Sequence, residues 1–311
     1  MKNNRKNARS ISLKIIRGAS AGVNLFVMII LVAAIGYGCY ALWDSYALVE
    51  SASSDQYQVY QPEATENGPG FDELQTINPE VIAWLNVYGT KINYPVTQST
   101  DNWKYISTDC KGNYSLTGSI FMDYENSSDF SDFNTILYGH NMTPKIMFGN
   151  LKDFKEESYF QSHQYGDLYY GGRHYGLQFF AVLSTNAYNF DVYAPNVQGE
   201  ASQQSYLDNL LSIATWTRDV GVSTNDRIVL LSTCSNSATN ERDILAARIT
   251  DETYNNEFDV ADSGSNSIQS IDPTGWQALP LSIRILIIVI LILIVVAIIY
   301  RIIRKRKKKG R

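Results

Sequence analysis

The chain has 311 residues, 45% of them hydrophobic, and a formal net charge of −5 at pH 7. Its three cysteines are too few for a disulfide-rich scaffold, and a folded core of more than roughly 200 residues does not need one. Basic residues gather in the two terminal tails, which leaves the middle of the chain more acidic. That middle part lacks the basic clusters that a nucleic-acid-binding surface requires, so we expect no nucleic-acid partner.

Two long apolar runs lie near the ends of the chain, at residues 23–42 and 285–300. Roughly 20 apolar helical residues cross a hydrocarbon core about 30 Å thick. Basic residues precede the first run and follow the second, and such flanks stay on the cytoplasmic side. The sequence therefore predicts two spans of the plasma membrane with both termini in the cytoplasm. The first run is long for a signal peptide and no small-x-small cleavage site follows it, so a retained anchor is favoured over a cleaved signal.

The composition changes along the chain predict seven segments. Polar stretches rich in Gly, Pro and Ser flank a central domain and read as connecting segments. The C-terminal basic run is typical of a topology signal that contacts the anionic headgroups of membrane lipid. In order, we expect a cytoplasmic basic tail (1–20), a transmembrane helix (21–43), a flexible stalk (44–70), a folded domain (71–254), a linker (255–279), a transmembrane helix (280–300) and a cytoplasmic basic tail (301–311).

Inside the folded domain, apolar residues between positions 74 and 85 have helical spacing and predict an opening helix, kinked near Pro79. Stretches rich in β-branched and aromatic residues predict strands at 91–96, 118–123, 134–139, 167–172, 174–185, 227–233 and 243–250. Further helices are expected at 147–154 and 203–217. Strands outnumber helices without a regular βαβ alternation, which favours a mainly β barrel or sandwich with helical additions.

Three residues at the ends of predicted strands form a candidate site for acyl transfer: His140, Cys234 and Arg242. A thiolate is the attacking form of cysteine, and an imidazole can take the thiol proton or return one to a leaving amine. An arginine keeps its charge and can stabilise an oxyanion. The alternatives are a buried structural cysteine, a solvated arginine, and a disulfide between Cys234 and Cys110.

The remaining candidates have weaker settings. His163 and His174 are expected on the surface, and no two His or Cys residues have the spacing of metal ligands, so we expect no metal site. Arg248 competes with Arg242, because six positions along a strand return to the same face. Ser232 and Thr233 precede the cysteine, and they either line a substrate groove or pack within the strand.

Several of these motifs together resemble the sortases, the cysteine transpeptidases of Gram-positive cell surfaces. The sequence LSTCS at 231–235, followed by Arg242, is similar to their TLxTC signature and downstream arginine, although Leu230 replaces the first threonine. ILYGHNM followed by MFGNLKDF, together with residues 81–106 and 118–126, resembles class B sortases in particular. The similarity covers about residues 71–252.

This resemblance implies a closed β-barrel of about eight strands, here flanked by the two predicted transmembrane helices. It implies Cys234 as nucleophile, His140 as general acid and base, and Arg242 as the oxyanion-stabilising or substrate-stabilising residue, with no cofactor and no metal. The substrates it implies are secreted proteins with a C-terminal sorting motif, which pass through a thioacyl enzyme to an amine. We expect that amine to come from a peptidoglycan precursor of the cell wall, and the first alternative is a class B-type pilin polymerase that uses a lysine of another subunit. A catalytically silent wall-binding module is the lower-ranked alternative.

Overall fold

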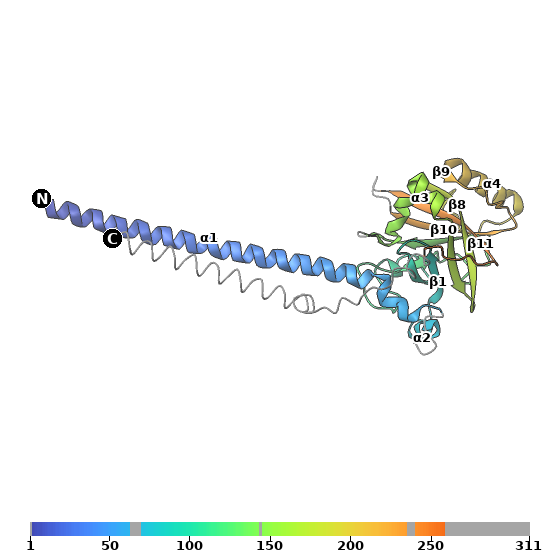
Figure 1. The fold of residues 1–311 in the computed structure, drawn as a ribbon, viewed down its shortest axis with the longest axis horizontal. Coiled ribbons are helices and arrows are strands. Elements are labelled where there is room, and N and C mark those ends of the chain that lie inside the picture. Colours follow the sequence, from blue (N-terminus) through green and yellow to red (C-terminus); the bar gives the residue numbers. More distant parts are fainter. Residues whose placement is uncertain (1, 63–69, 143–144, 235–239, 259–311) are drawn as a thin grey trace. The chain divides into compact units, whose positions relative to one another are not determined.

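The computed structural model describes residues 2–62, 70–142, 145–234 and 240–258 (Figure 1). The chain divides into two compact units, of which the second covers residues 46–264. Helix α1 (Lys2–Ala52) contains the stretch Ile15–Asp44, the one helical stretch in the described residues that is long and apolar enough to cross a membrane. Its position agrees with the first predicted span. The second predicted span, at 280–300, lies outside the described residues.

Eight strands of the second unit form a closed barrel. Their order around it is β11-β10-β4-β3-β2-β1-β7-β8, and β8 pairs again with β11 to close the ring. The pairs β2–β3 and β4–β10 are parallel and the other pairs are antiparallel. The predicted barrel of about eight strands is thereby confirmed. The strands are β1 (Val81–Val87), β2 (Asn93–Thr97), β3 (Ile120–Met122), β4 (Asn134–Gly139), β7 (Tyr165–Tyr170), β8 (Arg173–Asn186), β10 (Arg227–Cys234) and β11 (Glu241–Thr250).

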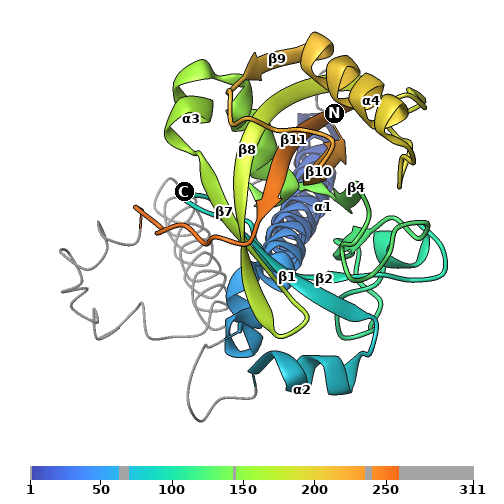
Figure 2. The same cartoon turned by 90° about the vertical axis from the view of Figure 1, so that its right-hand side faces the viewer.

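The other elements decorate this barrel. Strand β9 (Ala214–Thr217) pairs with β8 outside the ring, and β5 (Asn141–Met142) forms a short hairpin with β6 (Ile146–Met147). Figure 2 shows α2 and α4 on opposite sides of the barrel. The helical elements are η1 (Ser54–Tyr60), α2 (Gly70–Ile77), η2 (Lys104–Ile106), η3 (Phe148–Lys155), α3 (Glu157–Ser162) and α4 (Glu200–Ile213).

Two hydrophobic clusters lie on the two faces of the barrel wall. Because side chains alternate along a strand, Val229 and Leu231 of β10 belong to one cluster, while Ile228 and Leu230 belong to the other. The second cluster also contains Tyr206 and Leu210 of α4, so α4 covers this face of the wall. We call this the outer face of the barrel wall.

Three expectations from the sequence differ from the structure. The opening helix ends at Ile77, and the segment beyond Pro79 is strand β1, in which Val81, Ala83 and Leu85 alternate into the core. Proline lacks the N–H that a continuing helix needs, and the Asn78 side chain instead accepts a hydrogen bond from the N–H of Glu80 at 3.1 Å.

The helix expected over 203–217 ends at Ile213, because its last residues pair with β8 as strand β9. The segment 44–70, expected to be a flexible stalk, is helical over much of its described part and contacts the folded domain. Helix α1 continues to Ala52, whose carbonyl accepts a hydrogen bond from the Tyr94 hydroxyl at 3.0 Å, and Tyr57 of η1 is buried. Burial of Tyr57 makes this segment a part of the folded domain.

Candidate active site

Strands β4, β10 and β11 are neighbours in the barrel, and their register brings the predicted site residues to one end of it. Thr233 of β10 pairs with Gly139 of β4, so His140 and Cys234 are the next residues of two parallel strands. Cys234 itself pairs with Arg242 across the antiparallel β10–β11 ladder. The backbone thus places His140, Cys234 and Arg242 side by side on three adjacent strands.

His140 is held at its backbone and at its ring. Its carbonyl accepts a hydrogen bond of 3.0 Å from the N–H of Phe148, where η3 begins. Its Nε2 atom lies 2.9 Å from the carbonyl oxygen of Ile106, at the end of η2. The preceding residue, Gly139, leaves room for the buried Phe148 ring, since a Cβ atom there would lie 2.7 Å from Phe148 Cδ2. This close packing fixes the point at which the chain turns from β4 into His140.

The two candidate arginines lie at opposite ends of β11. Arg242 is half-buried, pairs with Cys234 and donates to the carbonyl of Glu241 at 3.2 Å. Arg248 donates to Gln178 Oε1 at 2.8 Å and lies 3.9 Å from Asp226 Oδ1. At about 3.3 Å per residue, the six-residue separation puts the two Cα atoms roughly 20 Å apart. Arg242 is therefore the arginine at the end of the barrel that carries Cys234.

A buried carboxylate next to Arg242 was missed by the sequence reasoning. The Asp243 side chain is only 2% exposed, and its Oδ1 accepts from Lys155 Nζ at 2.6 Å and from Ser184 Oγ at 2.8 Å. These two contacts link Asp243 of β11 to β8 and to η3. The first residue of η3, Phe148, also donates the hydrogen bond to the His140 carbonyl. The alternation along β11 could have indicated it, because position 243 shares the core face of Leu245 and Ala247.

Ser232 and Thr233 are buried, with 1% and 2% of their surface exposed. Ser232 Oγ lies 2.8 Å from the hydroxyl of Tyr193, and the Tyr193 ring stacks on Tyr138. The Tyr138 hydroxyl donates to Asp123 Oδ2 at 2.8 Å, and burial, aided by the Asp123 charge, raises the pKa of Tyr138. This burial favours packing over an open groove for both residues.

The remaining thiol and histidines have structural settings. Cys110 is a free, buried thiol, and burial, followed by the charge of Asp109, raises its pKa to about 12, so it carries almost no thiolate at neutral pH. His174 Nδ1 pairs with Asp167 at 2.8 Å. Within the described residues, no three His, Cys, Asp or Glu side chains gather into a metal site.

The expectation that His163 lies on the surface is wrong. Its ring is buried between Tyr159, with centroids 3.7 Å apart, and Phe258, at 4.6 Å. Burial lowers the pKa of this imidazole below its usual value. Phe258 lies in the segment expected to be a linker, so the start of that segment packs against the domain through this stack.

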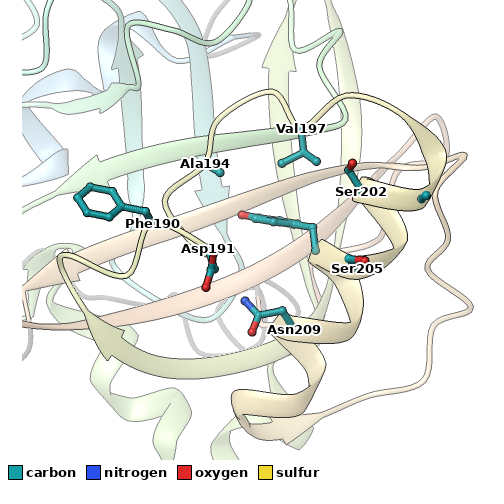
Figure 3. Close-up of a pocket in the computed structure, with 9 residues that line it drawn as sticks. Phe190, Asp191, Ala194, Val197, Ser202, Ser205 and Asn209 are labelled. Carbon is teal, nitrogen blue, oxygen red and sulfur yellow. The ribbon is translucent and has the colours of Figure 1, made fainter.

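A cavity of about 580 Å³ opens between α4 and the loop that joins it to β8 (Figure 3). One of its walls is Tyr206, which belongs to the cluster on the outer face of the barrel wall together with Leu230 and Ile244. The lining does not include His140, Arg242 or Asp243. The lining residues are Phe190, Asp191, Ala194, Val197, Ala201, Ser202, Ser205, Tyr206 and Asn209.

Comparisons with known proteins agree with this architecture. The model of the sortase domain family matches residues 85–250. Sortase B of Listeria monocytogenes is 34% identical over 186 residues, which cover 58% of this chain and 75% of that protein. The crystal structure of sortase B from the type II pilus of Streptococcus pneumoniae is 47% identical, with a TM-score of 0.53 over 59% of this chain and 99% of that one. The Staphylococcus aureus sortase B–substrate complex is 30% identical, with a TM-score of 0.55 over 64% of this chain and 90% of that one.

Proposed function

Because the chain belongs to the sortase family of cysteine transpeptidases and is of the class B type, we propose that Cys234, His140 and Arg242 form its catalytic group. The observation that carries the proposal is the register of β4, β10 and β11, which puts the three residues at the same end of adjacent strands. Acyl transfer needs a nucleophile, a proton carrier and an oxyanion donor within reach of one carbonyl.

In the proposed reaction, the Cys234 thiol gives its proton to His140 and the sulfur attacks a backbone carbonyl of the substrate. The tetrahedral intermediate then collapses as the C–N bond breaks, and the His140 imidazolium gives its proton to the leaving amine. An acceptor amine attacks the resulting thioester, its proton passes to His140, and the Cys234 sulfur leaves. The enzyme regains its starting state, and one amide bond has replaced another.

Arg242 supports the charged oxygen of both tetrahedral intermediates in this proposal. Its guanidinium uses one hydrogen bond on the neighbouring Glu241 carbonyl, and a guanidinium carries five N–H donors, so others remain for a substrate oxygen. An oxyanion donor of this kind lowers the barrier by about 3 to 4 kcal/mol.

We propose that the substrate is the C-terminal sorting motif of a secreted protein and that it binds at the end of the barrel that carries Arg242, on the side of the outer face. The period of two along β10 assigns position 234 to the same face as Leu230 and Ser232. The cavity lies between α4 and the loop that joins it to β8, and its wall combines Phe190 and Tyr206 with Asp191 and Asn209. We propose that residues of the motif upstream of the cleaved bond use these apolar and polar contacts.

The acceptor has two candidates. Attachment to the cell wall requires an amine of a peptidoglycan precursor, whereas a pilin polymerase uses a lysine of another subunit. The chain is 47% identical to a sortase B from a pilus, but only 30–34% identical to the sortase B proteins of Listeria monocytogenes and Staphylococcus aureus. The higher identity supports the second candidate, a pilin polymerase. For localisation, we propose that Ile15–Asp44 anchors the chain in the plasma membrane, with the second span at 280–300 and the catalytic domain outside.

The experiment uses the full chain in detergent micelles and a library of sorting-motif peptides, with mass spectrometry as the readout. A peptidoglycan-type amine and a lysine-bearing pilin subunit are offered in the same reaction. Peptide joined to the peptidoglycan-type amine supports attachment to the cell wall, and covalent ladders of the pilin subunit support the pilin polymerase. No cleavage of any peptide, with a Cys234 that iodoacetamide does not label, would favour the silent wall-binding module instead.

A further inference from the structure

The contact between His140 and Ile106 determines which imidazole nitrogen can exchange protons. A backbone carbonyl oxygen is only an acceptor of hydrogen bonds. The Nε2 atom that lies 2.9 Å from the Ile106 oxygen must therefore carry a hydrogen and donate a hydrogen bond to it. In the neutral ring the other nitrogen, Nδ1, then carries the lone pair. Which nitrogen of a histidine is protonated is set by the hydrogen bond that the other one makes.

We infer that the Ile106 carbonyl is a positioning group that holds His140 in the Nε2–H tautomer, and that Nδ1 carries the catalytic proton. The inference deepens the proposed function and rests on it for the role of His140. The proton of the Cys234 thiol moves to Nδ1, which gives an imidazolium with both nitrogens protonated. Nδ1 then returns the proton to the leaving amine, while Nε2–H stays on the carbonyl throughout.

The position of the Ile106 carbonyl depends on Gly118, a glycine outside the proposed catalytic group. Gly118 has φ +58°, and a Cβ atom there would overlap the Tyr105 carbonyl oxygen and lie 2.6 Å from the Ile106 oxygen. The next residue, Ser119, donates its N–H to the Tyr105 carbonyl at 3.0 Å. Any side chain at position 118 must therefore displace the peptide group that His140 contacts. Gly118 is thus a second positioning residue, which acts through the Ile106 carbonyl.

Gly112 offers a matched control within the same loop between β2 and β3. It also has a positive φ, +87°, but a Cβ atom there would meet nothing within 4 Å. Gly112→Ala therefore also places an alanine at positive φ, but without pressing on the Ile106 peptide. A difference in the His140 tautomer or in kcat between Gly118→Ala and Gly112→Ala therefore reports the effect of displacing the Ile106 carbonyl.

The tautomer is measured directly by 15N NMR of the histidine rings in the full chain in micelles. The chain has only three histidines, so three ring systems are observed. Cys234→Ala removes the thiol proton and lets His140 be measured as a neutral ring at about pH 9, well above the usual histidine pKa of about 6.5. We expect a protonated, pyrrole-type Nε2 and a bare, pyridine-type Nδ1. A protonated Nδ1, or an even mixture of tautomers, would overturn the inference whether or not the enzyme is a transpeptidase.

The variants then test the role of Gly118. In the Cys234→Ala background, Gly118→Ala should convert the His140 signals to a mixture of tautomers, and Gly112→Ala should leave them unchanged. In the otherwise unchanged enzyme, Gly118→Ala should lower kcat about 10- to 100-fold with little change in KM, the scale expected when a catalytic group is misplaced by about 1 Å. A loss of kcat with an unchanged tautomer would refute the positioning role of Gly118. If Gly118→Ala does not fold, the tautomer of the Cys234→Ala chain alone decides the inference.

Discussion

Removal of the ammonium group from the buried Lys155–Asp243 pair tests how much this ion pair stabilises the end of the barrel that carries the site. In Lys155→Met, the Asp243 carboxylate, only 2% exposed, retains just the Ser184 hydroxyl among the partners that the structure describes. Breaking a buried ion pair by removing one partner costs about 3 to 5 kcal/mol, because a charge stays buried without compensation. Lys155 is itself 31% exposed, so we expect the lower end of this range, about 3 kcal/mol.

The free energy of unfolding is measured by denaturant titration of the full chain in micelles, with thermal melting as a second probe. At about 2 to 4 °C per kcal/mol for a domain of this size, the melting temperature of Lys155→Met should fall by about 6 to 12 °C. Lys152→Met is the matched control, because Lys152 lies on the same η3 and has no ion pair within the described part of the chain. It should change the free energy of unfolding by less than about 0.5 kcal/mol.

A double-mutant cycle separates the pair from the packing of the lysine stem. Asp243→Asn keeps an acceptor for Ser184 and removes the buried charge. In that background, Lys155→Met should therefore lower the free energy of unfolding far less. The coupling energy should lie near the upper part of the usual 0.5 to 3 kcal/mol range for residues in contact. Additive effects, or a loss below about 1 kcal/mol for Lys155→Met, would refute the interpretation of a buried, compensated carboxylate.

Three further predictions concern single side chains. Arg242→Lys should lower kcat about 10²- to 10³-fold in the peptide assay, because an ammonium cannot reproduce the guanidinium donors, whereas Arg248→Lys should stay within about threefold of the parent. Equal losses would contradict the assignment of Arg242. The pKa of His163 is lowered by burial, so below about pH 6.5 the unfolded chain binds a proton that the folded chain does not, and stability falls with falling pH. His163→Phe should flatten this part of the curve of unfolding free energy against pH, and an unchanged slope would refute the assignment. Cys110→Ala should retain full activity, since its pKa of about 12 leaves it protonated, and a loss of activity without a loss of stability would give Cys110 an unexpected role.

The strands that carry the site could be predicted from the sequence because their patterns are unambiguous. NTILYG matches β4 from Asn134 to Gly139, and RIVLLSTC forms β10 to its last residue. Each is a short apolar run that ends at a polar loop, so the positions of His140 and Cys234 at strand ends followed directly. Their proximity did not follow from the pattern, because it depends on the parallel pairing of β4 with β10, two strands far apart in the chain.

Other features were ambiguous or invisible in the sequence. Val81, Ile82 and Leu85 fit a helical spacing as well as a strand, and only pairing with β2 and β7 decides between them. The contact of the His140 ring with Ile106 involves a backbone carbonyl, which no residue type signals. His163 looked like a surface residue because Phe258, one of the two rings that bury it, comes from a segment far along the chain.

The most direct test of the proposed acyl transfer is the mass of the enzyme after reaction with a cleaved sorting peptide when no acceptor amine is present. We predict an intact mass raised by the acyl part of the peptide, with the addition mapped to Cys234 and removed when an amine is added. The addition should be absent in Cys234→Ala and present in Cys110→Ala. An addition mapped to any other residue, or continued peptide cleavage by Cys234→Ala, would contradict the proposed mechanism.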